Sequence, residues 1–273
     1  MTIDIILKNK MNKSLKNQQQ SLNRDALFGD GFFTTLVIEN GNVLNESLHI
    51  QRLNESAKRL KFNHWNSDTL VTQLKSLAEA NPNSIVRINC SRVQKERGYA
   101  FHSNSHTQCE FMIHPLIKKT SQACELRIAE TPISVNSMLA GLKHINRLDN
   151  VLAASECQTA EQEVLMCHND RVISGSRSNL FVKLDGGWFT PTISDCGIKG
   201  IMQNVVLKTM KELGVQCEFK NIYKNDLEKM SAAFVTNSIL GIWPAKSFQK
   251  PSGNSISNLD LNCVMDLKKR LKL

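Results

Sequence analysis

The amino-acid sequence predicts an α+β protein of two α/β domains, the smaller at the N-terminus. The chain has 273 residues, 41% of them hydrophobic, which is enough for two cores. Short alternating strands and amphipathic helices are mixed along its whole length. A polar stretch at residues 118–123 separates two such groups. We therefore predict a small domain at residues 1–115, a linker at 116–123 and a large domain at 124–273.

The first elements are a short strand at residues 3–7 and a polar, loop-like segment at residues 9–23. Gly29 and Gly31 then bracket an acid in front of a β-rich run, which predicts a tight turn that leads into a strand. Asn40-Gly41 is a strong hairpin signal that returns the chain as a second strand.

The next segments alternate in period between helix and strand. Residues 46–62 predict an amphipathic helix, and a second helix covers residues 68–80 before Asn81-Pro82. A strand follows at residues 84–91, and then a loop at residues 92–100 that is dense with cations. A strand at residues 109–116 ends the small domain.

The large domain begins with a strand at residues 125–133, followed by the helix discussed next. Hairpin turns are predicted at Asn169-Asp170 and Asp185-Gly186. A glycine-punctuated loop opens a helix near residue 201, and its exposed amides form a common type of phosphate site. A buried-type strand at residues 232–238 and a basic C-terminal helix at residues 260–273 complete the domain.

Lys143 is the residue on which the functional interpretation depends. Ile145, Leu148 and Leu152 recur at helical spacing, so we expect a helix whose buried face begins just after the lysine. A positive charge is unfavourable at the N-terminus of a helix, because the macrodipole is positive there. We therefore expect the pKa of Lys143 to be lowered, which favours the neutral amine that bonds covalently to carbonyl groups.

Three arginines are candidates for binding anionic groups. Arg52 follows His49 by one turn in the first predicted helix, where it can bind a phosphate bidentately. Arg59 lies on another face of that helix, and we interpret it as a solvated surface residue. Arg97, next to Gly98 and Tyr99 in the cationic loop, is a plausible carboxylate ligand, although such charge runs are commonly solvated.

Composition narrows the classes of protein. No run of about 18 apolar residues suggests a membrane span, and the N-terminus does not resemble a secretory signal. The eight cysteines contain no Cys-x-x-Cys pair, so we expect reduced thiols, no metal site and a cytoplasmic location. The formal charge of +9 lies partly in terminal runs and aromatic residues are only 6%, so an anionic small molecule is at least as good a partner as nucleic acid.

In this order, the segments resemble the fold type IV pyridoxal-phosphate enzymes, and their lyase branch more than their aminotransferases. Each motif is weak singly, but their joint order and spacing covers nearly the whole chain. The resemblance lies in residues 28–35, 49–52, 97–99, 140–148, 178–181, 197–202 and 236–238.

The resemblance implies a pyridoxal 5'-phosphate site between the two domains. Lys143 would bind the cofactor covalently and then act as the base that moves the proton. The phosphate ligands would be Arg52, the amides of Ile201 and Met202, and Ser238. Thr34 with its neighbours Phe33 and Thr35, Arg97, Tyr99 and Asn237 would face a substrate with two carboxylates. Arg147 is expected near the cofactor, with no role assigned. The resemblance also implies a homodimer.

Ser174 departs from the pattern of the family, which places a glutamate there against the pyridine nitrogen. A carboxylate keeps that nitrogen protonated, whereas a hydroxyl can only hydrogen-bond to it. A transaminase would suffer from the weaker electron sink, whereas an elimination that expels pyruvate and gains aromaticity depends on it less. The serine therefore either favours the lyase interpretation or marks a damaged copy of such an enzyme.

Two other classes of function stay open. An aminotransferase acting on D- or branched-chain amino acids would share the fold, although Ser174 and the run from Lys143 to Leu148 speak against it. A basic binding module without catalytic activity is supported only by the net charge.

Overall fold

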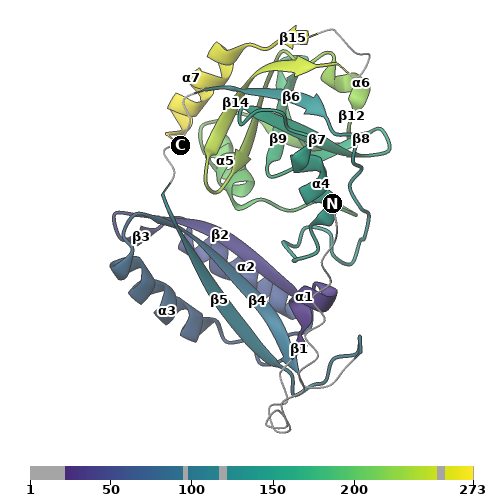
Figure 1. Ribbon diagram of the computed structural model, residues 1–273. Coiled ribbons are helices and arrows are strands. Elements are labelled where there is room, and N and C mark those ends of the chain that lie inside the picture. Colours follow the sequence, from purple (N-terminus) through teal and green to yellow (C-terminus); the bar gives the residue numbers. More distant parts are fainter. Residues whose placement is uncertain (1–21, 95–97, 117–121, 251–255, 273) are drawn as a thin grey trace, which may run out of the picture.

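The chain forms two β-sheets with helices packed against each, as the computed structural model shows for residues 22–94, 98–116, 122–250 and 256–272 (Figure 1). Strands up to residue 115 form a five-stranded sheet, and those from residue 124 onward form a ten-stranded sheet. The strand expected at residues 3–7, most of the predicted linker and Arg97 lie outside the described residues.

The first sheet is antiparallel, with the order β1-β4-β2-β3 and with β5 on β4. Its strands are β1 (Leu22–Asn23), β2 (Gly31–Glu39), β3 (Asn42–Val43), β4 (Ser84–Gln94) and β5 (His106–Pro115). The predicted hairpin is confirmed, because Asn40 and Gly41 have φ values of 51° and 76° between β2 and β3. Two positive φ angles give a turn whose twist matches that of the strands.

Two helices cover one face of this sheet, after the short helix α1 (Arg24–Phe28). They are α2 (Glu46–Arg59) and α3 (Ser67–Ala80), as the sequence predicted to within a few residues. Leu53 and Leu74 are fully buried against the sheet, and each contributes about 2 kcal/mol of hydrophobic stabilisation. The side chain of Asn66 accepts from the amides of Asp68 and Thr69, which fixes the start of α3.

The second sheet mixes parallel and antiparallel pairs, in the order β11-β10-β9-β13-β14-β6-β7-β8-β12 with β15 on β14. Its strands are β6 (Cys124–Ile128), β7 (Gln162–His168), β8 (Arg171–Gly175), β9 (Asn179–Leu184), β10 (Gly187–Pro191), β11 (Cys217–Lys220), β12 (Ile222–Tyr223), β13 (Ala232–Asn237), β14 (Gly241–Gln249) and β15 (Ile256–Asn258). Both predicted hairpin turns in this region are confirmed.

Four helices accompany the second sheet. They are α4 (Leu148–Ser155), α5 (Ile201–Glu212), α6 (Lys224–Leu227) and α7 (Leu261–Leu271). Helices α5 and α7 pack on a core in which the rings of Phe181 and Phe234 are stacked 4.6 Å apart. Asn179 at the start of β9 donates to the carbonyl of Ile198 (2.9 Å), which ties β9 to the residues just before α5.

Residues 139–146, which we call the lysine segment, lie between the two halves of the chain and hydrogen-bond to both. On one side the amide of Phe33 in β2 donates to the carbonyl of Lys143 (2.9 Å). On the other side the amide of Gly141 donates to the carbonyl of Gly197 (2.9 Å). Lys143 is therefore held by backbone contacts to both halves of the chain.

The helix predicted after Lys143 begins later than expected and buries a different face. Helix α4 starts at Leu148, and Leu148 and Leu152 are 72% and 51% exposed, whereas Ala153 is fully buried. The prediction that Lys143 lies at a helix entrance is therefore wrong. The strand predicted at residues 125–133 likewise ends at Ile128.

No helix among the described residues is long and apolar enough to cross a membrane.

Candidate active site

A cavity of about 320 Å³ lies between the lysine segment, strands β2, β8 and β13, and the N-terminus of α5. Most of the residues proposed from the sequence line it. These are Arg52, Lys143, Ser174, Ile201, Met202, Asn237 and Ser238.

Lys143 is half-buried in this cavity, with its ammonium nitrogen 4.5 Å from the ring centre of Phe33. Burial, and then the charges of Arg52, Arg147 and Arg87, lower the pKa of Lys143 from 10.5 to about 7. The lowered pKa was expected, but its cause is desolvation and neighbouring cations rather than a helix dipole. The lowered pKa makes the neutral amine accessible near neutral pH.

Arg52 projects from α2 across the boundary between the two sheets. One of its terminal nitrogens donates to the carbonyl of Lys199, just before α5 (2.5 Å). Burial lowers the pKa of Arg52 to about 10, so its guanidinium remains charged at neutral pH. It therefore places a fixed positive charge beside the N-terminus of α5.

That N-terminus supplies further hydrogen-bond donors. Gly200 is the N-cap of α5, and Ile201 and Met202 in its first turn line the cavity. Amides of a first helical turn have no partner within the helix and favour anions. A Cβ at Gly200 would lie 1.9 Å from Oδ1 of Asn179, so only glycine allows this approach.

Two buried hydroxyls in the wall find no hydrogen-bond partner in the part of the chain that the structure describes, Oγ of Ser178 and Oγ1 of Thr236. Buried polar atoms in folded proteins are nearly always paired. The cavity is therefore suited to a polar occupant that these two groups can bind.

The charge of the cavity wall has one sign. Its cations are Arg52, Arg87, Lys143, Arg147 and Arg177, and the described residues place no Asp or Glu in its lining. Such a wall selects an occupant with several negative charges. Elsewhere too, the described residues contain no group of three or more His, Cys, Asp or Glu side chains placed to hold a metal ion.

Arg87 was not singled out from the sequence. It lies in β4, and its guanidinium stacks on the ring of Phe33 (3.8 Å) while Nε donates to Asn89 (2.8 Å). The available signal was an arginine in the middle of an otherwise buried-type strand. Such a residue needs a partner or a cavity, because burying an unpaired charge is costly.

The structure also gives Arg147 a role. Its guanidinium donates to the carbonyls of Leu142 (2.8 Å) and His144 (3.0 Å), on either side of Lys143. Arg147 therefore both adds charge to the cavity and fixes the backbone that carries the lysine.

Thr34 does not line this cavity, which corrects the substrate contact expected of it. Successive side chains of a strand point to opposite faces, so Phe33 and Thr35 line the cavity and Thr34 faces α2. Its hydroxyl is fully buried at 2.7 Å from Nδ1 of His49. Burial, Arg52 and Lys143 lower the pKa of His49 to about 3, so this imidazole is neutral.

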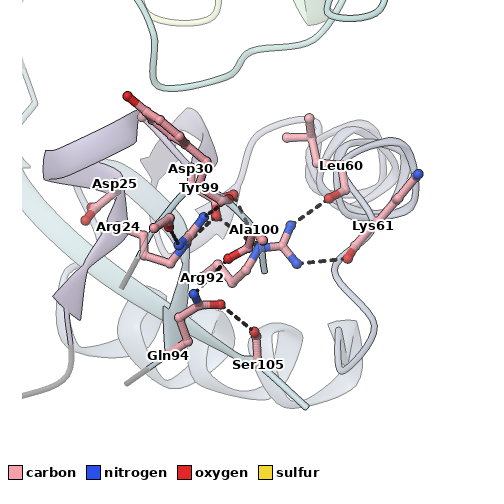
Figure 2. A network of polar contacts seen from close by, with 12 residues as sticks. Arg24, Asp25, Asp30, Leu60, Lys61, Arg92, Gln94, Tyr99, Ala100 and Ser105 are labelled. Atoms are coloured by element: carbon pink, nitrogen blue, oxygen red, sulfur yellow. Dashed lines mark hydrogen bonds and ion pairs between the residues drawn. The ribbon is translucent and has the colours of Figure 1, made fainter. Parts of the chain in front are cut away.

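Tyr99 is also placed elsewhere, 85% exposed with its ring 5.1 Å from that of Phe28. Figure 2 shows the network that fixes this region. Asp30 accepts from Nε of Arg24 (2.7 Å) and of Arg92 (3.1 Å), and Arg24 also donates to the carbonyl of Tyr99 (2.8 Å). Arg92, which the sequence placed in a cationic loop, is thus a buried structural residue at the end of β4.

The prediction that Arg59 is a solvated surface residue is wrong. Its terminal nitrogens donate to the carbonyls of Ala140 (2.9 Å) and Met138 (3.0 Å). The carbonyl of Ala140 lies in the lysine segment, and that of Met138 lies directly before it. Helix α2 therefore holds this segment through Arg59 and reaches the cavity through Arg52.

Comparison with known proteins supports the same architecture. A family model described as amino-transferase class IV matches residues 31–248. The chain is 26% identical over 235 residues to aminodeoxychorismate lyase of Vibrio harveyi, covering 84% of this chain and 86% of that protein. It is 24% identical over 228 residues to D-alanine aminotransferase of Bacillus licheniformis, covering 82% and 81%.

Among solved structures, the chain is similar to 4-amino-4-deoxychorismate lyase from Pseudomonas aeruginosa. The TM-score is 0.85 at 27% identity, covering 93% of this chain and 94% of that one. The branched-chain amino acid aminotransferase of Escherichia coli shares the fold, with a TM-score of 0.78 at 19% identity over 92% of this chain and 88% of that one. The predicted fold type IV architecture is confirmed, and the chain belongs to the amino-transferase class IV family.

Proposed function

We propose that this protein is a pyridoxal-phosphate-dependent lyase that converts 4-amino-4-deoxychorismate to 4-aminobenzoate and pyruvate, a reaction of folate biosynthesis. The observation that carries the proposal is a lysine whose pKa is lowered to about 7, in a cavity whose charged lining side chains, among the described residues, are all cationic. The similarity to lyases from Vibrio harveyi and Pseudomonas aeruginosa supports this choice of substrate.

The residues of the cavity fit the cofactor. Arg52, the first-turn amides of Ile201 and Met202, and the hydroxyl of Ser238 would hold its phosphate. The partnerless hydroxyls of Ser178 and Thr236 offer further hydrogen bonds to the bound group. Lys143 would bind it covalently, because the lowered pKa of its amine makes the neutral, nucleophilic form accessible near neutral pH.

The substrate carries two carboxylates, which need donors. Arg87 and Asn237 line the cavity and are free of acidic partners among the described residues, so we propose them as ligands. Arg97 remains a proposed ligand from the sequence. The hydroxyl of Thr35 lies on the same face of β2 as Phe33, which is the position first expected for Thr34.

The reaction removes a proton from the ring carbon that carries the amino group. The bond from the neighbouring carbon to the enolpyruvyl oxygen then breaks, and its loss completes the aromatic ring. Bound pyridoxal phosphate supplies an electron sink for this step. The amine of Lys143, released when the amino group of the substrate takes its place on the cofactor, would accept this proton, since the cavity lowers its pKa toward neutrality. The released enol gains a proton to become pyruvate.

A decisive experiment is to supply purified protein and pyridoxal phosphate with 4-amino-4-deoxychorismate and to measure pyruvate and 4-aminobenzoate together. We expect equal amounts of both products, and no product from Lys143→Ala. Transfer of an amino group from D-alanine or a branched-chain amino acid, without elimination, would instead indicate an aminotransferase. Failure to bind pyridoxal phosphate at all would leave only the basic binding module.

We also propose that the protein is a cytoplasmic homodimer. A broad cavity of about 840 Å³ adjoins the first one and shares Phe33 and Arg147 with it. Exposed apolar side chains lie in and beside its lining, and a second copy would cover them. They are Leu27, Val135, Leu148 and Val151. All eight cysteines are free, which supports a reducing compartment.

A further inference from the structure

We propose that this site keeps the ring nitrogen of bound pyridoxal phosphate unprotonated, because the cavity wall offers hydroxyls, amides and cations but, among the described residues, no carboxylate. The inference deepens the proposed function and rests on its cofactor. Pyridoxal-phosphate enzymes commonly place a charged partner on this nitrogen, and an acidic partner keeps it protonated. Whichever part of the described wall the nitrogen faces, it meets no acidic side chain.

Ser174 shows what the wall offers instead. It lies in β8 with 6% of its surface exposed and lines the cavity. Its Oγ donates to the carbonyl of Gly175 (3.0 Å), a bond that rotation of the hydroxyl can exchange for one to a ligand. A hydroxyl can donate to a neutral ring nitrogen, but it cannot compensate the charge of a protonated one.

The carboxylate directly behind this wall, Glu163 in β7, is already satisfied. Its Oε1 accepts from the hydroxyl of Ser176 (2.8 Å) and its Oε2 from Nε of Arg177 (3.1 Å). The side chain is fully buried, and a Cβ at Gly175 would lie only 2.7 Å from Oε1. Both oxygens of Glu163 are therefore engaged by Ser176 and Arg177, and Glu163 is not among the residues that line the cavity.

Asp149 is another acid near this site, and it does not line the first cavity. Its Oδ2 accepts from the amide of Ser134 (3.1 Å), and it lines the broader second cavity. Neither acid is placed to hold a proton on a group inside the first cavity.

The cations of the wall act in the same direction. Arg52, Arg147 and Arg87 all lower the pKa of Lys143, so they disfavour any additional positive charge in this cavity. A protonated ring nitrogen would be such a charge. Their effect is relieved in part by the phosphate and the substrate carboxylates, which we place at the arginines rather than at Ser174.

An unprotonated ring accepts less electron density from the substrate. Amino-group transfer depends on that capacity throughout, whereas an elimination that completes an aromatic ring has its own driving force. The wall thus favours elimination over transamination, because its described residues place no carboxylate where it could keep the ring nitrogen protonated.

The test is nitrogen NMR of the protein loaded with pyridoxal phosphate labelled with ¹⁵N in the ring. For the wild type we expect a shift typical of neutral pyridine and no coupling to a bound proton. Ser174→Glu should move the resonance toward that of pyridinium. The matched variant Ser174→Gln, of similar size but without charge, should leave the resonance where the wild type has it.

A pyridinium signal in the wild type would overturn the inference, whatever the variants show. Borohydride reduction followed by peptide mass analysis establishes that each variant carries the cofactor on Lys143 before its spectrum is used. The spectrum requires no turnover, so a neutral ring in a protein that releases no pyruvate would contradict the lyase proposal alone. As a second readout, Ser174→Glu should raise half-transamination of alanine relative to elimination, and Ser174→Gln should not.

Discussion

Lys143 lies in a cavity, and backbone hydrogen bonds fix its segment to β2 on one side and to Gly197 on the other. In the folded protein its pKa of about 7 lies below the ordinary value of 10.5, because burial and three arginines disfavour the charged form. Between these two pH values the unfolded chain binds more protons than the folded chain. The free energy of unfolding must therefore rise with pH in this range, as far as it depends on Lys143. The effect of Lys143 is most destabilising near and below pH 7, where the folded protein must hold a charged ammonium in the cavity.

We predict that Lys143→Met removes this dependence. In cofactor-free protein, urea denaturation should show the variant to be more stable than the wild type near pH 7, with the difference shrinking as pH rises toward 10.5. The difference between the two proteins isolates Lys143, because all other titrating groups are shared. A difference that does not change over this range would show that the amine is not desolvated.

Arg52 is the second residue whose substitution separates binding from chemistry. If Arg52 holds the cofactor phosphate as proposed, Arg52→Ala removes a charge-assisted contact of about 1.5–3 kcal/mol, so the Kd for pyridoxal phosphate should rise roughly 10- to 150-fold. The turnover of the saturated enzyme should change much less. Equilibrium titration of the visible absorption of the bound cofactor measures the first quantity. An unchanged Kd would remove Arg52 from the phosphate site.

Helix α2 contacts the lysine segment through Arg59 as well as the cavity through Arg52. We predict that Arg59→Ala lowers the free energy of unfolding by about 1.5–3 kcal/mol, because the carbonyls of Met138 and Ala140 lose a charged donor. It should also slow covalent capture of pyridoxal phosphate by Lys143. Arg59→Lys should restore part of both properties, since it keeps the charge and one donor direction.

Glu55→Ala is the matched control for Arg59. It removes the exposed ion pair between Glu55 and Arg59 (3.7 Å) but leaves both carbonyl contacts intact. Exposed pairs contribute little, so we expect wild-type stability and capture rate. Equal effects of Glu55→Ala and Arg59→Ala would show that the ion pair matters and the carbonyl contacts do not.

Helix α4 exposes large apolar side chains to solvent in the single chain, which is unfavourable unless a second subunit covers them. Val151 is 60% exposed beside the second cavity, and Leu148 is 72% exposed. For the whole molecule this predicts association through α4. Sedimentation at micromolar concentration should give twice the chain mass for the wild type, and the single chain mass of 30.7 kDa for Val151→Glu.

Leu213→Glu is the control for the dimer prediction. Leu213 is 41% exposed at the end of α5 and does not line the second cavity. The same change of charge there should leave the sedimentation coefficient unchanged. A wild type that sediments as a single chain would contradict the proposed homodimer, and equal effects of both variants would place the interface elsewhere.

Local pattern was enough for the elements that bury one continuous face. Helices α2, α3 and α7 and the hairpin at Asn40-Gly41 follow from residues close together in the sequence, because helical period and turn chemistry act over a few residues. The motifs in their order also identified the family and the lysine. Lys143, Arg52 and Ser174 all line one cavity although the sequence spreads them over more than a hundred positions.

Long-range packing set the rest. Leu148 and Leu152 have helical spacing, but α4 buries Ala153 instead, in a cluster with Val164 and Met166 of β7. Tertiary packing also places Arg87 of β4 beside Phe33 in the site, and it places Thr34 within hydrogen-bond distance of His49. It likewise brings Arg59 to the carbonyl of Ala140, so that Arg59 binds the lysine segment instead of solvent. The spacing of residues in the sequence predicts which face of a helix or strand a side chain lies on. It does not predict which distant segment packs against that face, because that contact forms only in the tertiary structure.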